Sequence, residues 1–170
     1  MRSADALFAV PTLFLIVAFA TLIPPGLTST LALFGLTSWM EIARTGRAEI
    51  LSLKSRDFII AARTIGLGPF AIFFRHILPN TWTPLLVQAT NLIGNIILAE
   101  SSLSFIGLGI QPPIPSWGNM ISEGRDVLTQ GWWTAVFPGA ALALTVVGFN
   151  LIADGVRDLF DPRASHSPRS

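Results

Sequence analysis

DFIIAARTIGLGPFAIFFRHILPN, residues 57–80, separates two strongly apolar parts of the chain. Its first half predicts a short amphipathic helix, because Asp57 stands where the helix dipole favours a negative charge and Gly66 stands where glycine commonly closes a helix. We predict a second short helix over residues 70–78, which leads through Pro79 into the next apolar stretch. A short helix in the longest basic loop of the chain indicates a surface offered to a soluble partner.

The composition is typical of an integral membrane protein. Apolar residues make up 51% of the chain and charged residues 12%, whereas a soluble domain carries about 25% charged residues. The apolar residues fall in blocks that are long enough to cross a bilayer, which takes about 20 residues of helix. The chain has no cysteine, which excludes disulfides and thiolate metal sites. Its net charge of +1 gives no reason to expect a nucleic-acid partner.

The apolar blocks predict four membrane spans and therefore an all-α fold, a polytopic transmembrane helical bundle. Each span must be a helix, because the bilayer core offers no water to backbone groups. The turn signal PPG ends the first span, and a Trp-Trp pair opens the fourth at headgroup depth. The spans are residues 6–23, residues 27–40 with 41–43 completing the span at the interface, residues 81–99 and residues 132–153.

The basic residues predict the orientation of these spans. Only Arg125 lies between the third and fourth spans, whereas the loop between the second and third contains Arg44, Arg47, Lys54, Arg56, Arg63 and Arg75. Basic residues accumulate in cytoplasmic loops, so residues 44–80 are predicted to be cytoplasmic. An even number of spans then places both termini in the cytoplasm. Residues 164–170, ASHSPRS, predict a short disordered tail.

The first apolar stretch also fits a second interpretation, a cleaved signal peptide. Residues 18–20, AFA, form a small-residue cleavage pattern, and Arg2 would be the basic start. Asp5 weakens that basic region. The tight PPG turn into another apolar stretch favours a helical hairpin.

The helix predicted from Asp57 has an apolar face formed by Phe58, Ile59, Ala62 and Ile65. Ala61 and Ala62 keep part of the helix slim, so that another surface can approach closely. Two interpretations fit this pattern. The helix could lie on the lipid headgroups, or it could dock onto a partner protein.

The residues of this loop resemble a known family motif. The similarity is to the EAA loop of the permease subunits of binding-protein-dependent ABC importers, and it rests on Asp57, Ala61, Ala62, Gly66, His76, Ile77, Leu78, Pro79 and Asn80. In that family the short helix couples the membrane subunit to an ATPase. Asp57 stands where the motif has Glu, and Thr64 stands where Ala is common.

Two further stretches resemble the dipeptide, oligopeptide and nickel permeases of the same family. LSFIGLGIQPPIPSWGNMISEGRD, residues 103–126, is similar to their outer loop before the last helix, and FNLIADGVRDLFDPR, residues 149–163, to their C-terminal end. The resemblance implies a permease transmembrane domain over residues 1–163, in a bacterial or archaeal inner membrane. It implies coupling to the ATPase through Asp57, Ala61, Ala62, Gly66, His76 and Pro79.

The resemblance also implies partners and a transport cycle. The partners would be a second permease subunit, two ABC ATPase subunits and an extracytoplasmic solute-binding protein. The cycle would import peptides, nickel or similar small solutes by alternating access. A family permease has two more helices before the point where this chain starts, so we expect the C-terminal part of a six-helix-type subunit. The alternative is a non-functional or scaffold fragment of such a permease.

The third predicted span carries a candidate solute path. Polar residues recur along it at spacings of three and four, which places them on one helix face: Gln88, Asn91 and Asn95, with Thr81, Pro84 and Ser102. Lipid cannot form hydrogen bonds with side-chain amides, so this face should turn toward the interior of the helical bundle. It could line the path or bond a partner helix, because interhelical amide bonds of roughly 1 kcal/mol are common in bundles.

The predicted outer loop offers three candidate site residues, Phe105, Pro113 and Trp117. Residues 103–110 are apolar but too short to span, and the prolines that follow fix an extended turn before Trp117. A half-inserted lid over the path and a cap packed on the fourth span both fit this pattern. Glu100, Glu123 and Asp126 make the outer face mildly acidic.

The sequence does not predict an enzyme or a bound cofactor. Lys54 is the only lysine and no P-loop motif surrounds it, so the energy for transport must come from another subunit. The two histidines, His76 and His166, belong to no HExxH pattern and predict no metal site. A serine hydrolase would need a serine and a histidine together at membrane depth, whereas His76 is predicted to be cytoplasmic.

Overall fold

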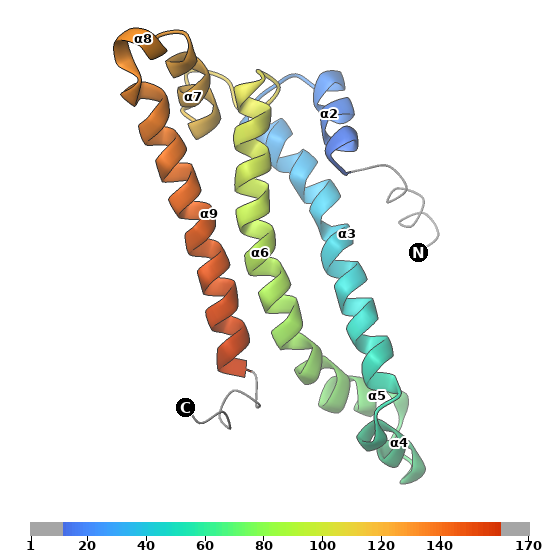
Figure 1. Ribbon diagram of the computed structural model, residues 1–170. Coiled ribbons are helices and arrows are strands. Elements are labelled where there is room, and N and C mark those ends of the chain that lie inside the picture. Colours follow the sequence, from blue (N-terminus) through green and yellow to red (C-terminus); the bar gives the residue numbers. More distant parts are fainter. Residues whose placement is uncertain (1–11, 161–170) are drawn as a thin grey trace, which may run out of the picture. The chain divides into compact units, whose positions relative to one another are not determined.

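The computed structural model describes residues 12–160, and this part of the chain consists of helices and turns without strands (Figure 1). The all-α prediction is therefore confirmed. Residues 6–11 of the first predicted span and the predicted tail at 164–170 lie outside the described residues. In chain order the elements are α2 Thr12–Leu22, α3 Leu27–Lys54, α4 Asp57–Thr64, α5 Pro69–Ile72, the π-helix η1 Phe73–Ile77, α6 Leu78–Phe105, α7 Trp117–Arg125, α8 Leu128–Gly131 and α9 Trp133–Phe160.

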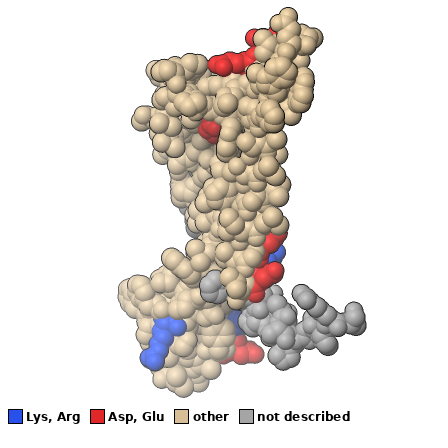
Figure 2. Space-filling model, turned by 90° about the vertical axis from the view of Figure 1, so that its left-hand side faces the viewer, with Lys and Arg blue, Asp and Glu red and all other residues tan. Residues whose placement is uncertain are grey.

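Two helical stretches among the described residues are long and apolar enough to cross a membrane. They are Pro69–Phe105, 37 residues with a mean hydropathy of 1.2, and Trp133–Leu159, 27 residues with a mean hydropathy of 1.9. Only 11% of the most apolar part of each is buried inside the protein. The core helix of a soluble domain would be mostly buried, so these helices instead expose apolar surface that suits lipid or further helices. Most of the surface drawn in Figure 2 is correspondingly uncharged.

These two stretches contain the predicted third span and, apart from Trp132, the predicted fourth span. The predicted second span is the first part of α3, which continues to Lys54 as one helix of 28 residues. The predicted first span overlaps α2, of which 11 residues are described. That α2 and α3 also cross the membrane remains a prediction.

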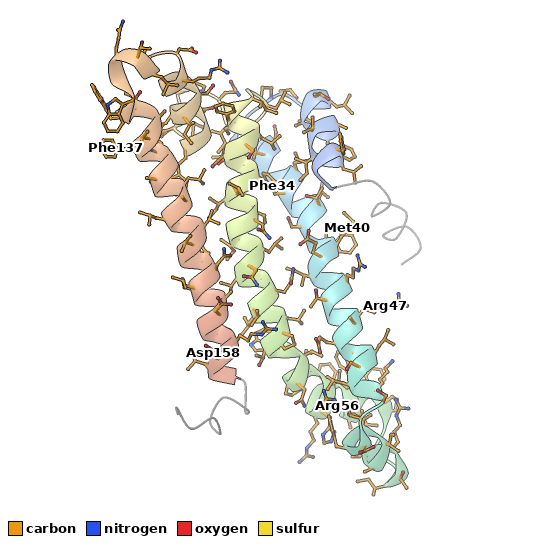
Figure 3. The ribbon with its side chains drawn as sticks, viewed as in Figure 1. Phe34, Met40, Arg47, Arg56, Phe137 and Asp158 are labelled. Carbon is orange, nitrogen blue, oxygen red and sulfur yellow. The ribbon has the colours of Figure 1, made fainter. Side chains whose placement is uncertain are left out.

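The chain divides into two compact units. The first comprises Met1–Met40 and Leu92–Phe149, and the second comprises Glu41–Asn91 and Asn150–Ser170. The core of the first unit joins three helices: Ile16 and Ala20 of α2 pack with Leu33 and Phe34 of α3 and with Leu103 of α6. Figure 3 labels Phe34 on α3. The predicted PPG turn separates α2 from α3, and it allows α2 to lie beside the beginning of α3 (Figure 1).

Buried hydroxyl groups on α3 are satisfied within the helix. The Thr30 hydroxyl donates to the Gly26 carbonyl at 2.8 Å, and the Thr37 hydroxyl donates to the Leu33 carbonyl at 2.9 Å. Bonds to the carbonyl four residues earlier let an otherwise apolar helix carry threonine without an unpaired donor. This arrangement suits a helix in an environment without water.

The second unit corrects the prediction of a separate short helix over residues 70–78. Helices α5 and α6 are joined by η1 into a single stretch, Pro69–Phe105. At its end the Leu78 N–H donates to the Phe73 carbonyl, one residue further back than in an α-helix. Pro79 has no N–H and its ring crowds the carbonyl four residues earlier, so the wider π turn accommodates it without ending the helix. The Asn80 side-chain amide donates to the His76 carbonyl at 2.6 Å.

Candidate functional site

Helix α4 starts where the sequence predicts, at Asp57. The turn from α3 is tight, because the Arg56 N–H donates to the Leu53 carbonyl at 3.0 Å. Arg56 lies between α3 and α4 in an extended conformation with φ −77° and ψ 144°, and its carbonyl accepts from the N–H groups of Ile59 and Ile60 (Figure 3). The backbone therefore fixes the direction in which α4 leaves α3.

An apolar cluster holds α4 against its neighbours in the second unit. Ile59 is fully buried at 0% exposure, and Ala62 is buried beside it. They pack with Leu53 at the end of α3, Ile72 of α5 and Ile77 of η1. Burying an isoleucine side chain contributes about 1.5–3 kcal/mol, so one side of this short helix is firmly anchored.

The end of α4 is closed by a Schellman motif at Gly66. The Gly66 N–H donates to the Arg63 carbonyl at 3.0 Å, and the Leu67 N–H donates to the Ala62 carbonyl at 3.1 Å. Gly66 has a φ of +84°, a conformation that glycine adopts without the steric cost other residues meet. Leu67 then packs against the cluster around Ile59. The predicted role of Gly66 in ending the helix is confirmed.

The predicted apolar face of α4 is buried only in part. Ile59 and Ala62 face the cluster, whereas Phe58 is 42% exposed and Ile65 is 78% exposed. The alanine pair divides in the same way, since Ala62 is buried and Ala61 is exposed. The helix has apolar residues on more than one side, and packing on α5 and η1 buries only one of them.

The second unit exposes several large apolar side chains outside this cluster. Ile60 is 51% exposed and Phe70 is 80% exposed, and Phe58, Ile65 and Phe74 are exposed as well. Gly66 and Gly68 have open space where a side chain would stand. A short helix that is anchored on one side and apolar on the other is suited to contact another surface.

The structure brings His76 of η1 to α4, from which it is separated in sequence by α5. The rings of Phe58 and His76 lie 6.4 Å apart between centroids, at an interplanar angle of 53°. Of the predicted coupling residues, Asp57, Ala61 and Ala62 thus lie on α4, Gly66 lies in its cap, and His76 lies beside its first turn. Pro79 is exposed in the first turn of α6.

The polar face predicted for the third span lies along α6. In the second unit Gln88 and Asn91 are half-buried, and the buried Thr81 donates its hydroxyl to the Leu78 carbonyl at 2.9 Å. In the first unit Asn95 is exposed. The burial of this face decreases from Thr81 to Asn95, and its role in lining a solute path remains a prediction.

The loop that is predicted to be the outer loop is built around the end of α6, in the first unit. A second Schellman motif closes α6 at Gly107, whose φ is +82°, because Gly107 and Leu108 donate to the carbonyls of Ser104 and Leu103. The buried Ser104 hydroxyl donates to Glu100 Oε1 at 2.6 Å and accepts from the Ile110 N–H at 2.9 Å. Residues 103–105 therefore complete α6, and the predicted apolar segment 103–110 is divided between this helix and a turn.

Sequence reasoning missed α7, which follows the proline-rich turn. Ser116 caps it by accepting from the Asn119 N–H at 3.2 Å, and the Asn119 side chain donates to the Ile110 carbonyl at 2.7 Å. The sequence signal for this helix was present, because serine is a favoured residue at the N-terminal cap of a helix. In the structure Ser116 has the extended conformation that is typical of such a cap. Among the predicted loop residues, Trp117 opens α7, Pro113 is exposed in the turn, and Phe105 lies 5.9 Å from the Arg125 guanidinium.

Glycines let the elements of the outer loop approach closely. A side chain at Gly118 would collide with the Ser101 carbonyl, and one at Gly109 would collide with Ser104. A side chain at Gly124 would lie 2.6 Å from the Ala135 backbone nitrogen, so α7 packs directly on the start of α9. This contact favours the cap on the fourth span over the half-inserted lid.

These features define a class, a helical membrane protein with long apolar helices connected by ordered helical loops. The chain belongs to the family of binding-protein-dependent transport system inner membrane components, which it matches over residues 1–166. Members of this family are transport permeases and not enzymes. The resemblance drawn from the sequence is thereby confirmed, and the protein is located in a membrane.

Individual relatives carry peptide-transport names. A Brucella ovis protein named "Putative peptide permease protein" is 45% identical over 166 residues, 96% of this chain and 55% of that protein. The di/tripeptide transport system permease protein DppC of Pseudomonas aeruginosa is 38% identical over 167 residues, 98% of this chain and 55% of that protein. The oligopeptide transport system permease protein OppC of Bacillus subtilis is 37% identical over 163 residues, 96% of this chain and 53% of that protein. The chain thus spans about half the length of the curated relatives it matches.

Proposed function

We propose that this chain forms the membrane-spanning part of a permease in an ATP-driven importer. The importer moves peptides, nickel or similar small solutes from an external binding protein to the cytoplasm. Peptides are favoured among these, because similar chains from three bacteria carry peptide-transport names. In this proposal four spans cross the inner membrane, both termini are cytoplasmic, and α4 docks onto an ATPase subunit.

The observation that carries the proposal is that α4 is buried on one side and exposes apolar side chains on the other. The cluster around Ile59 fixes the helix to the end of α3 and to the continuous stretch Pro69–Phe105. A force applied to the exposed side of α4 is therefore transmitted to two long helices, without a flexible segment between them. Such coupling through packed, rigid elements is the physical requirement for a conformational lever.

The transport cycle follows from this lever. ATP closes a dimer of two ATPase subunits, and α4 moves with the subunit to which it is docked. A second permease subunit supplies the opposite half of the path, and the paired bundles reorient to release the solute inward. The polar face of α6 around Gln88, Asn91 and Asn95 is the candidate lining of that path.

A helix lying on lipid headgroups is the alternative role for α4, and an experiment separates the two. The chain has no cysteine, so Ala61→Cys introduces a single thiol on the exposed side of α4. With a bifunctional maleimide we expect this thiol to crosslink to a co-expressed ATPase. We also expect an impermeant maleimide to label the thiol only after the cell membrane has been opened.

The matched control is Thr129→Cys, on an exposed position of α8 that the proposal places outside the cell. Its thiol should be labelled in intact cells and should form no ATPase crosslink. Equal crosslinking by the two variants, or none by Ala61→Cys in assembled transporters, would rule out the docking role of α4.

A further inference from the structure

The first unit contains a pocket of about 460 Å³ between α7 and the start of α9. Met120 and Glu123 line it from α7, and Trp133, Phe137 and Pro138 line it from α9. Its volume is within the range of about 300–1,000 Å³ that is typical of sites for small ligands. The wall is mainly apolar, and among the described residues that line it only Glu123 is charged.

Glu123 has no cation beside it in residues 12–160. Arg125, the nearest basic residue in sequence, pairs with Asp126, since its Nε lies 3.5 Å from the Asp126 Oδ1 atom. Glu123 itself forms no ion pair in this part of the chain. The residue is exposed, so its carboxylate stands at the open side of the pocket. A cation that does not belong to these residues can therefore reach it.

The α9 side of the pocket belongs to a helix that can cross a membrane. Trp133 and Phe137 lie in the first two turns of the stretch Trp133–Leu159. Phe137 is 67% exposed and its neighbour Val136 is 48% exposed, so apolar surface continues from the pocket along α9 (Figure 3). Trp132 and Trp133 are both exposed, and tryptophan favours the depth of the headgroups. An acyl chain can therefore enter the pocket directly from the bilayer.

We propose that this pocket binds an ethanolamine phospholipid, with its ammonium group at Glu123 and an acyl chain along Phe137 and Pro138. The ammonium group has N–H donors and forms a charge-assisted hydrogen bond with a carboxylate, whereas a choline headgroup has no N–H. An anionic headgroup would meet Glu123 with a charge of the same sign. The site goes beyond the proposed function, because it depends on the membrane location of α9 and not on transport.

The test uses phosphatidylethanolamine and phosphatidylcholine that carry the same photoreactive acyl chain, each in nanodiscs that contain the full chain. We expect phosphatidylethanolamine to label residues 133–138 about threefold more than phosphatidylcholine does. Glu123→Gln should abolish this preference, because it removes the charge and keeps the size of the side chain. A threefold change corresponds to about 0.65 kcal/mol, which is within the range for an exposed ion pair.

Two control variants match the position and the chemistry. Asp126→Asn removes an exposed carboxylate from the same loop that does not line the pocket, and it should keep the preference for phosphatidylethanolamine. Phe137→Ala should lower labelling by both lipids, whereas Val136→Ala, at a neighbouring exposed position outside the pocket lining, should change it little. Circular dichroism checks that all variants keep their helicity.

Four results would overturn the proposal. The two lipids could label the chain equally, the labels could lie outside the pocket, or Asp126→Asn could lose the preference as Glu123→Gln does. The fourth is loss of labelling by both lipids when the chain is assembled with a second permease subunit. That result would show that protein, and not lipid, occupies the pocket.

Discussion

The loop that contains α4 and the loop that contains α7 share one local motif and pack differently. A Schellman motif with a glycine of positive φ closes α4 at Gly66 in the first loop, and another closes α6 at Gly107 where the second loop begins. Beyond that point the α4 loop leaves open space around Gly66 and Gly68, whereas the α7 loop uses Gly109, Gly118 and Gly124 to bring backbones into contact.

This difference indicates separate tasks for the two loops. The α7 loop completes its own packing through polar bonds around Ser104, and it already has a neighbour in the start of α9. The α4 loop is anchored by one apolar cluster and exposes apolar side chains on its other side. A closed loop needs no partner to be ordered, whereas an open apolar surface gains stability when another surface covers it.

The largest effect is expected from Ile59→Ala, which removes the side chain that anchors α4. Loss of a fully buried isoleucine costs about 2–5 kcal/mol, and here the loss falls on a small cluster. We expect residues 57–67 to lose protection in hydrogen exchange and ATPase stimulation by the assembled transporter to fail.

Ile60→Ala is the matched control, because Ile60 is the next residue and is 51% exposed. Its stability should change by less than about 0.5 kcal/mol. If Ile60 contacts the ATPase, this variant weakens ATPase association while hydrogen exchange stays unchanged. Equal protection of α4 in the two variants would contradict the anchoring role of Ile59.

Gly118→Ala should destabilise the α7 loop by about 3 kcal/mol, at the upper end of the cost of overpacking. The added methyl group collides with the Ser101 carbonyl on α6, and a backbone oxygen cannot move aside as a flexible side chain can. Thermal unfolding in detergent measures the loss. Gly139→Ala adds the same group to α9 where nothing lies within 4 Å, and it should not lower stability. Similar melting temperatures for the two variants would refute the close contact.

Gly66→Ala is expected to cost about 1–2 kcal/mol through its left-handed backbone conformation alone, because no atom lies within 4 Å of the added carbon. Gly68→Ala has the same open surroundings but a φ of −66°, so its cost should be close to zero. Unfolding measurements on the pair isolate the free-energy cost of the left-handed backbone conformation at Gly66.

Gly66→Asp adds a charge to the same strained backbone position, and we expect this variant to uncouple the ATPase while membrane insertion continues. ATPase association equal to that of the parent chain would contradict this expectation.

Local sequence signals were sufficient to predict both ends of α4 and the positions of the two most apolar helices. Asp57 and Gly66 determine the helix ends through the dipole and the left-handed cap, and both effects act within one turn. The long apolar stretches identified α6 and α9 by composition.

The missed features depend on residues that are distant in sequence or on competing local signals. The burial of Ala62 and not of Ala61 depends on Ile72 and Ile77, which lie beyond the next turn. Pro79 indicates a helix end when considered alone, but the π turn at η1 absorbs it. The prolines before Ser116 concealed the capping signal that starts α7.

The smallest effect on stability is expected at Asn91, halfway along α6 between the two loops. Asn91 is half-buried, so Asn91→Leu should leave thermal unfolding nearly unchanged if its amide faces a solute path. Solute uptake by the assembled transporter should then fall, because the path loses a polar group.

Thr90→Val is the control at the neighbouring position, where the hydroxyl donates to the Leu86 carbonyl of its own helix at 2.9 Å. If Asn91 instead bonds a neighbouring helix, uptake and stability fall together by an amount that reflects one interhelical bond, roughly 1 kcal/mol. The ratio of the two losses therefore decides whether this face of α6 conducts solute or holds the bundle together.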